Sequence, residues 1–281
     1  MESMRKLFKS NIRQYGMIIA LVLITLLFQV LTKGILLKPL NVTNLILQNG
    51  YVLILAIGML PIIITGRIDL SVGSVVAFIG ALAAIMMVNY KVPLVLTLAA
   101  CIAVGALIGA WHGFWTAYVG IPAFITTLSG MLIFRGLTIA ILEGKSIGPL
   151  YPSFRSISNS FIPDLLGKGT LNLTALAVGA LLCAYMVGQG FVQRIEKKRY
   201  GFEILPVWMF ILKQAFMCAA LMMLAYFMAA YNGIPALLVL LVFLIIFYSF
   251  ITDNTVIGRR IYALGGNEAA ARLSGINTRQ K

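Results

Sequence analysis

The chain of 281 residues is 61% hydrophobic and only 11% charged. Soluble globular chains are about 45–50% apolar and about 25% charged, so this composition excludes a soluble globular protein and indicates an integral membrane protein. The formal net charge of +14 could suit nucleic acid. The distribution of that charge along the chain favours a role in membrane topology instead, and we expect no nucleic-acid partner.

Eight apolar stretches follow one another along the chain. Each is near the length of about 20 residues that a helix needs to cross a bilayer. They cover residues 15–32, 48–65, 71–88, 93–118, 122–142, 171–190, 207–230 and 235–251. Strands of a barrel would be about 10 residues long and alternate in polarity. The sequence therefore predicts an all-α, polytopic membrane bundle of about eight helices.

The basic residues predict the orientation of these spans. If the N-terminus is cytoplasmic, fourteen of the 22 Lys and Arg fall in cytoplasmic segments. Six fall in outer segments, and two lie within or at the edge of spans. The outer six are Lys33, Lys38, Lys91, Lys145, Arg155 and Lys168, and the remaining two are Arg135 and Lys213. This bias follows the positive-inside rule, so we expect both termini in the cytoplasm and contact of the basic segments with anionic lipid.

The stretch G-R-I-D-L-S-V-G-S, residues 66–74, places charged and polar side chains between two apolar spans. One interpretation is structural: Asp69 or Ser71 caps the helix that follows, while Gly66 and Gly73 permit the break and close packing. The other interpretation is functional, because interrupted helices often bound the cavities of transporters. Both can hold, since a capped helix start can also form the edge of a gate.

The segment of residues 258–277, G-R-R-I-Y-A-L-G-G-N-E-A-A-A-R-L-S-G-I-N, predicts a short helix on the cytoplasmic side. Asn267 is a favourable N-cap, and Glu268 lies where its charge meets the positive end of the helix dipole. Gly275 stands where a left-handed residue ends the helix. We expect a hinge at Gly265 and Gly266 before a helix over Asn267–Ser274, suited to dock in a groove of a partner.

This tail segment resembles the coupling loop of permease subunits of ABC importers for monosaccharides, the ribose, xylose and multiple-sugar family. Three further stretches resemble the same family, in the same order and spacing: I-D-L-S-V-G-S (68–74), G-A-W-H-G-F-W-T-A-Y (109–118) and I-P-A-F-I-T-T-L-S-G-M-L-I-F-R-G (121–136). The xylose-like branch fits better than the ribose branch, because residues 171–230 form an additional hairpin of two spans. We expect one permease domain over residues 1–281, with residues 252–281 as its cytoplasmic coupling segment.

The resemblance implies an ATP-driven sugar path in the bacterial inner membrane. It also implies three partners: a separate ABC ATPase subunit, a periplasmic sugar-binding protein and a second permease copy. The expected ATPase-coupling residues are Gly266, Asn267, Glu268, Ala269, Ala270, Arg272 and Gly275. The expected residues of the translocation path or gate are Asp69, Ser71, Gly73, Trp111 and Phe124. The P-loop pattern G-x-x-x-x-G-K-[ST] does not occur, so we expect no ATPase site of its own, and no catalytic residue, metal or cofactor.

The chain departs from the family pattern in three places. Position 112 is His where relatives carry another polar residue, and Arg67 stands at a variable position. Relatives also continue with further spans after the position of Lys281, so the chain resembles the N-terminal part of such a permease. Besides the permease function, a non-transporting fragment and a secondary sugar carrier stay open. The carrier would need coupling-ion sites, and of the acidic residues only Asp69 stands close to the core of a span.

Overall fold

The computed structural model describes residues 12–167, 169–202 and 206–278. Nearly all of these residues are helical, and within them the chain forms no β-strand beyond one isolated bridge between Phe161 and Pro235. The expected all-α class is therefore confirmed. The chain divides into two compact units, one made of Met1–Gln48 and Phe161–Pro235 and the other of Asn49–Ser160 and Ala236–Lys281.

Among the described residues, seven helical segments are long and apolar enough to cross a membrane. They are Pro39–Ile64, Val72–Asn89, Leu94–Val119, Ala123–Leu142, Leu173–Arg199, Val207–Ala229 and Ala236–Asn254. Seven of the eight expected spans are thus confirmed by length and composition. The remaining one, expected at residues 15–32, corresponds to helix α2 (Ile12–Leu31), in which the described apolar stretch Ile19–Leu31 is shorter than the others.

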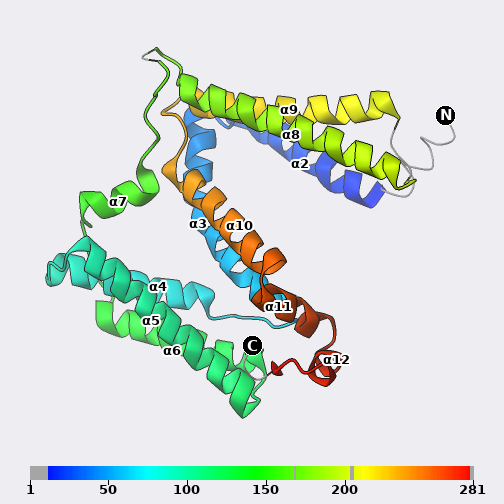
Figure 1. The fold of residues 1–281 in the computed structure, drawn as a ribbon. Coiled ribbons are helices and arrows are strands. Elements are labelled where there is room, and N and C mark those ends of the chain that lie inside the picture. Colours follow the sequence, from blue (N-terminus) through cyan, green and yellow to red (C-terminus); the bar gives the residue numbers. More distant parts are fainter. Residues whose placement is uncertain (1–11, 168, 203–205, 279–281) are drawn as a thin grey trace. The chain divides into compact units, whose positions relative to one another are not determined.

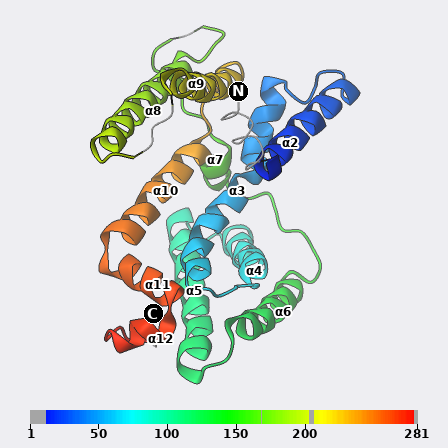
Figure 2. The ribbon, with the colours of Figure 1, turned by 90° about the vertical axis from the view of Figure 1, so that its right-hand side faces the viewer.

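The first unit contains α2, the N-terminal part of α3 (Pro39–Ile64), and the hairpin of α8 (Leu173–Arg199) and α9 (Val207–Ala229). Both views show α8 and α9 lying side by side (Figures 1 and 2). Small residues permit this close approach: a Cβ added at Gly179 of α8 would lie 2.6 Å from the Cβ of Ala225 on α9. The expected two-span hairpin is therefore present as a packed pair of helices.

The turn before α8 is organised around one carboxylate. Asp164 accepts hydrogen bonds from the backbone N–H groups of Leu166, Gly167 and Leu173 at 3.0–3.2 Å. It also accepts from both the N–H (3.1 Å) and the hydroxyl (2.8 Å) of Thr174. Asn172 caps α8, its side-chain oxygen accepting the N–H of Ala175. These bonds satisfy donors that the start of a helix leaves without intrahelical partners.

The second unit contains the remaining part of α3 and the helices that follow it in the chain. These are α4 (Val72–Ala84), α5 (Leu94–Phe114), α6 (Ala123–Leu142), α7 (Pro152–Asn159), α10 (Ala236–Asn254), α11 (Val256–Gly266) and α12 (Glu268–Leu273). Two spans end in π-helical turns, η1 (Ile85–Asn89) after α4 and η2 (Trp115–Val119) after α5. Helix α4 packs against both α5 and α6, and its buried positions Ala81, Ala83 and Ala84 are small.

We predict that the Asp164 carboxylate stabilises the first unit in a pH-dependent way. Desolvation raises the pKa of this carboxyl, but the hydrogen bonds from the Thr174 side chain and from the backbone of Leu173, Thr174 and Leu166 outweigh it and lower the pKa to about 2. A carboxyl whose pKa is lowered by folding contributes stability above its unfolded value, near pH 4, and that contribution is lost as the pH falls toward about 2. Asp164→Asn should therefore lower the thermal unfolding midpoint at pH 6.

The measurement is thermal unfolding of the purified protein between pH 2 and pH 6. The difference between wild type and Asp164→Asn should shrink as the pH falls below about 4. The matched control is Glu143→Gln, because Glu143 is 73% exposed and pairs only with the exposed Lys145 at 2.9 Å, an arrangement that contributes little to stability. An Asp164→Asn difference that is the same at pH 2 and pH 6 would contradict the role of the carboxylate charge.

Candidate functional site

The site begins where α3 ends in the second unit. Gly66 adopts φ of +74°, a left-handed conformation that glycine reaches without steric cost. Its N–H donates to the carbonyl of Ile63 (2.9 Å), and the N–H of Arg67 donates to that of Ile62 (3.3 Å). This pair of bonds is a Schellman motif, which satisfies carbonyls at a helix end. The expected break at Gly66 is thus encoded by local backbone chemistry.

The acidic residue of the break, Asp69, forms a turn and does not cap a helix. The Asp69 carboxylate accepts the N–H (2.8 Å) and the hydroxyl (2.7 Å) of Ser71, and Ser71 is 2% exposed. Helix α4 begins at Val72, and neither side chain bonds to its first N–H groups. The expected cap by Asp69 or Ser71 is wrong, because the two side chains hydrogen-bond to each other and not to the N–H groups of α4. Close packing at Gly73 is also wrong, since a Cβ added there would meet nothing within 4 Å.

A threonine of α6 ties the break to the neighbouring span. The hydroxyl of Thr127 accepts the N–H of Leu70 (3.1 Å) and donates to the carbonyl of Ala123 (2.9 Å) within its own helix. Thr127 is 4% exposed, so the bond is protected from water. The irregular backbone between α3 and α4 is therefore held in place by a side chain 57 residues further along the chain.

Asp69 and Thr127 line a cavity of about 250 Å³ together with His112 of α5 and Ile261 of α11. His112 is 7% exposed, and its Nε2 has no hydrogen-bond partner among the described residues. Glycine at position 130 of α6 makes room for the imidazole, because a Cβ added there would collide with Nε2. The cavity thus combines a carboxylate, a hydroxyl and an unpaired ring nitrogen, groups that can hydrogen-bond a polar solute.

The other expected path residues do not line this cavity. Trp111 contacts the ring of His112 (centroids 5.0 Å apart) and the edge of Phe134 (6.3 Å). It is 38% exposed, and Phe124 is 52% exposed on α6. Of the five residues expected on the path, the structure brings only Asp69 to the cavity wall. It adds His112 and Thr127, which the sequence alone did not assign to a path.

Helix α11 connects the last span of this unit to the break. Thr255 caps it by accepting the N–H of Gly258 at 3.2 Å. Gly265, near its other end, lies directly on the backbone of α3, because a Cβ added there would collide with the carbonyl of Ile64. The expected hinge at Gly265 and Gly266 is therefore wrong: both glycines belong to α11, and the chain turns at Asn267 instead (φ −160°, ψ 106°).

Helix α12 follows as a short helix fixed at both ends (Figure 2). The side chain of Asn267 accepts the N–H of Ala270 at 3.0 Å, and Glu268 occupies the first turn, both as expected. At the other end Gly275 has φ of +82°. The N–H groups of Gly275 and Ile276 donate to the carbonyls of Arg272 and Ala271, both at 3.1 Å, a second Schellman motif.

A second cavity joins α12 to the break. It has a volume of about 330 Å³ and is lined by Arg67, by Glu268 and Arg272 of α12, and by residues from Thr116 of η2 to Ala123 of α6. Arg67 thus faces the same space as the first acidic residue of α12. The two cavities share Arg67, Thr116 of η2 and Ala123 of α6.

The outer face of α12 is exposed. Ala271 is buried at 5%, whereas Ala269 and Ala270 are exposed and Leu273 is 90% exposed. Leu273 follows Ala269 by four residues and Ala270 by three, so all three lie on one side of the helix. Leu273 was not among the expected coupling residues, although its spacing from the two alanines could have identified it. No group of three His, Cys, Asp or Glu in the described part of the chain is placed to hold a metal ion.

Comparison with known proteins decides the family. Residues 41–280 match the family described as branched-chain amino acid transport system / permease component. The chain belongs to this permease family. It is 38% identical over 267 residues to the xylose transport system permease protein XylH of Escherichia coli (strain K12), which covers 95% of this chain and 66% of the relative. The corresponding XylH of Haemophilus influenzae is 36% identical over 98% of this chain and 71% of the relative.

Similarity to ribose permeases is weaker. The ribose import permease protein RbsC of Escherichia coli (strain K12) is 32% identical over 84% of this chain and 53% of the relative. The resemblance to sugar-importer permeases, and the preference for the xylose-like branch, are therefore confirmed. The chain spans about two thirds of the length of the xylose relatives. No solved structure matches it significantly. With seven apolar helices in its described part, this permease is a multi-pass membrane protein.

Thr127→Val should loosen the break of this permease without disturbing α6. Valine keeps the shape but removes the acceptor for the N–H of Leu70, and a lost hydrogen bond of this kind costs about 1 kcal/mol. That corresponds to a roughly fivefold larger open population, which should raise the rate of trypsin cleavage after Arg67 by the same factor. The control is Thr138→Val, because the hydroxyl of Thr138 bonds only to Phe134 within α6. Equal cleavage rates in the two variants would contradict the proposed tie.

Proposed function

We propose that this chain is the permease subunit of an ATP-driven importer that carries a xylose-like sugar, or several monosaccharides, across the bacterial inner membrane. Membership of the permease family and similarity to two xylose permeases support this function. The observation that carries it is α12, a helix capped at both ends with an exposed strip of Ala269, Ala270 and Leu273. Such a strip is suited to a groove on a separate ATPase subunit.

The chain has no ATPase site of its own in this proposal, so energy reaches it through α12. The caps at Asn267 and Gly275 hold α12 in shape before it binds, which lowers the entropy lost on association. The small side chains of Ala269 and Ala270 permit close approach, and Leu273 supplies apolar surface to bury. Glu268 serves the helix dipole and a basic group on the partner. Gly266 and Arg272 complete the coupling residues, one at the end of α11 and the other on the wall of the second cavity.

The sugar path is proposed to run past the break between α3 and α4. Asp69, Ser71 and Gly73 form its inner edge, and the cavity at Asp69 and His112 offers hydrogen-bonding groups to a polyol. Trp111 and Phe124 present exposed aromatic surface on which a sugar ring can stack. The contact of Gly265 with Ile64 and the shared position of Arg67 connect α12 to this edge, so movement of the ATPase can reach the path.

Two further partners belong to the proposal. A periplasmic sugar-binding protein delivers the sugar to the outer segments, and a second permease copy completes the membrane part of the importer. The chain acts as one permease domain over residues 1–281, with both termini in the cytoplasm. The unequal distribution of Lys and Arg supports this orientation.

Ala270→Glu should prevent association with the ATPase subunit while leaving membrane insertion unchanged. A carboxylate placed in a tight, dry contact is left unpaired and costs several kcal/mol, which corresponds to a loss of about a hundredfold or more in affinity. Leu273→Ala should weaken association less, because it removes apolar contact without adding a charge. The measurement is co-purification of the ATPase with each variant, together with sugar uptake.

The matched control for this experiment is Ser153→Glu. It adds the same charge to α7, an equally exposed short helix on the segment predicted to face outward. It should retain wild-type assembly with the ATPase. Wild-type assembly and uptake in Ala270→Glu would show that α12 is not the docking helix, and sugar uptake without ATP would favour a secondary carrier instead.

Cysteine labelling tests the proposed orientation. In a variant in which Cys101, Cys183 and Cys218 are replaced by Ala, a cysteine at Ser158 should react with an impermeant thiol reagent in spheroplasts. A cysteine at Lys198 should react only after the membrane is permeabilised. Both positions are exposed, so accessibility of the side chain is matched. Labelling of Lys198→Cys from outside would reverse the predicted topology.

A further inference from the structure

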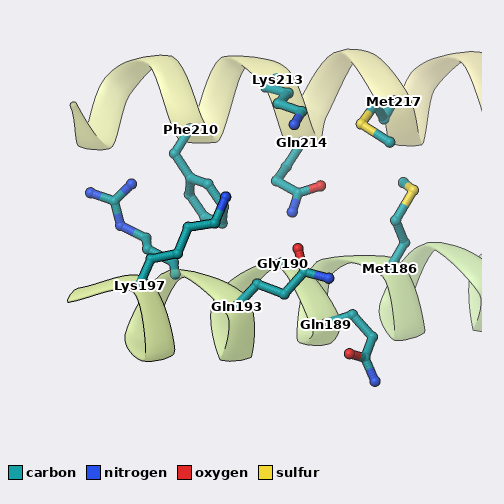
Figure 3. A pocket seen from close by; sticks show the side chains of 10 residues that line it. Met186, Gln189, Gly190, Gln193, Lys197, Phe210, Lys213, Gln214 and Met217 are labelled. Atoms are coloured by element: carbon teal, nitrogen blue, oxygen red, sulfur yellow. The ribbon is translucent and has the colours of Figure 1, made fainter. Parts of the chain in front are cut away.

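The α8–α9 hairpin of the first unit contains a cavity of about 310 Å³ that the sugar path does not use. It lies between the C-terminal turns of α8 and the N-terminal turns of α9 (Figure 3). Three cationic side chains line it, Arg194 and Lys197 from α8 and Lys213 from α9. No acidic residue is among the described residues that line it. The cavity is therefore electropositive and suits an anion.

An aromatic side chain positions one of the cationic groups. The guanidinium of Arg194 lies over the ring of Phe210, 5.0 Å from its centroid, and Phe210 in turn packs edge-on against Phe191 (5.2 Å). Within the described residues, neither Lys197 nor Lys213 forms an ion pair. Arginine and lysine together suit a phosphate group. The planar guanidinium of arginine can donate two hydrogen bonds to its oxygens, and the ammonium of lysine supplies a compact positive charge.

An uncharged acceptor completes the cavity. Gln214 reaches from α9 toward α8 (Figure 3), and its Oε1 is buried with no hydrogen-bond partner among the described residues. Gly190 makes this possible, because a Cβ added there would collide with the amide. The phosphodiester of a phospholipid carries no hydrogen at neutral pH to donate to this oxygen, but a hydroxyl of its head group does. The ligand that satisfies both features carries a phosphate and a neighbouring hydroxyl.

Adjacent apolar surface indicates where the rest of the ligand lies. A second hollow on α9, of about 400 Å³, shares Lys213 with the first and is otherwise lined by Trp208, Met209, Leu212 and Phe216. Trp208 is 58% exposed and Phe216 is 75% exposed. Tryptophan is enriched at the level of lipid head groups, and the run R-I-E-K-K-R of residues 194–199 marks the same end of the hairpin. An electropositive pocket beside an apolar groove matches a phospholipid.

We propose that the α8–α9 hairpin binds an anionic phospholipid with a hydroxylated head group, such as phosphatidylglycerol. Its phosphate lies between Arg194, Lys197 and Lys213, and a head-group hydroxyl donates to Oε1 of Gln214. Its acyl chains lie along Trp208, Leu212 and Phe216. The site holds this leaflet lipid against the hairpin, and the proposal does not depend on which sugar the permease carries.

The test uses Trp208 as a reporter in the full chain. Trp111→Phe and Trp115→Phe leave Trp208 as the sole tryptophan, since the chain has three. Proteoliposomes containing brominated phosphatidylglycerol or brominated phosphatidylcholine then give the relative binding of the two lipids from fluorescence quenching. Juxtamembrane cations contribute roughly fivefold each to binding of anionic lipid. We expect a clear preference for phosphatidylglycerol that falls at least fivefold in Lys197→Gln/Lys213→Gln.

The matched control is Lys198→Gln/Arg199→Gln, which removes two cations from the same end of α8 without touching the cavity lining. It should keep the preference, and circular dichroism checks that each variant is folded. If Lys197→Gln/Lys213→Gln misfolds, each single variant should lower the preference alone. An equal loss of the phosphatidylglycerol preference in both double variants would show that general surface charge causes it, and would contradict a specific site. Displacement of the lipid by millimolar inorganic phosphate or glycerol phosphate would assign the cavity to a soluble anion and overturn the lipid proposal.

Discussion

The permease depends on one constraint: a helix that breaks near a bilayer leaves backbone N–H and C=O groups that lipid cannot satisfy. The second unit meets this constraint with glycines and short polar side chains at each break. Gly66 closes α3 and Gly275 closes α12 by the same pair of backbone hydrogen bonds. Thr127 satisfies the N–H of Leu70 in the irregular segment between α3 and α4. Several backbone groups of the polar segment between α3 and α4 are therefore paired within the protein.

These breaks lie along one connected part of the second unit. Helix α11 touches the end of α3 through Gly265, and α12 shares a cavity with Arg67, two residues before Asp69. The exposed end of the chain that is proposed to meet the ATPase is thus connected to the polar cavity at Asp69 and His112 through contacts inside one unit. The residues proposed for coupling and for the sugar path are far apart in the sequence but belong to the same unit.

Local sequence chemistry predicted the features that depend on a few neighbouring residues. The apolar spans follow from the length and composition of each stretch, and the cap at Asn267 and the glycine ends at Gly66 and Gly275 follow from local backbone preference. Features that depend on distant partners could not be predicted. No residue near Leu70 in the sequence indicates that Thr127 will accept its N–H. The pair Gly265–Gly266 favours a hinge in the sequence, and only the structure shows Gly265 against the carbonyl of Ile64. Asp69 and Ser71 were both candidates for a cap, and their bond to each other removed them from that role.

The contact at Gly265 has a mechanical consequence. Because it joins backbone to backbone, no side-chain rotamer is available there to absorb a displacement, and the joint has low compliance. A side chain in this position would act as a spring, taking up part of any movement as a rotamer change of its own. With glycine, a small shift of α11 passes to the end of α3 with little attenuation. Because position 265 is glycine, α11 and the end of α3 meet through backbone atoms.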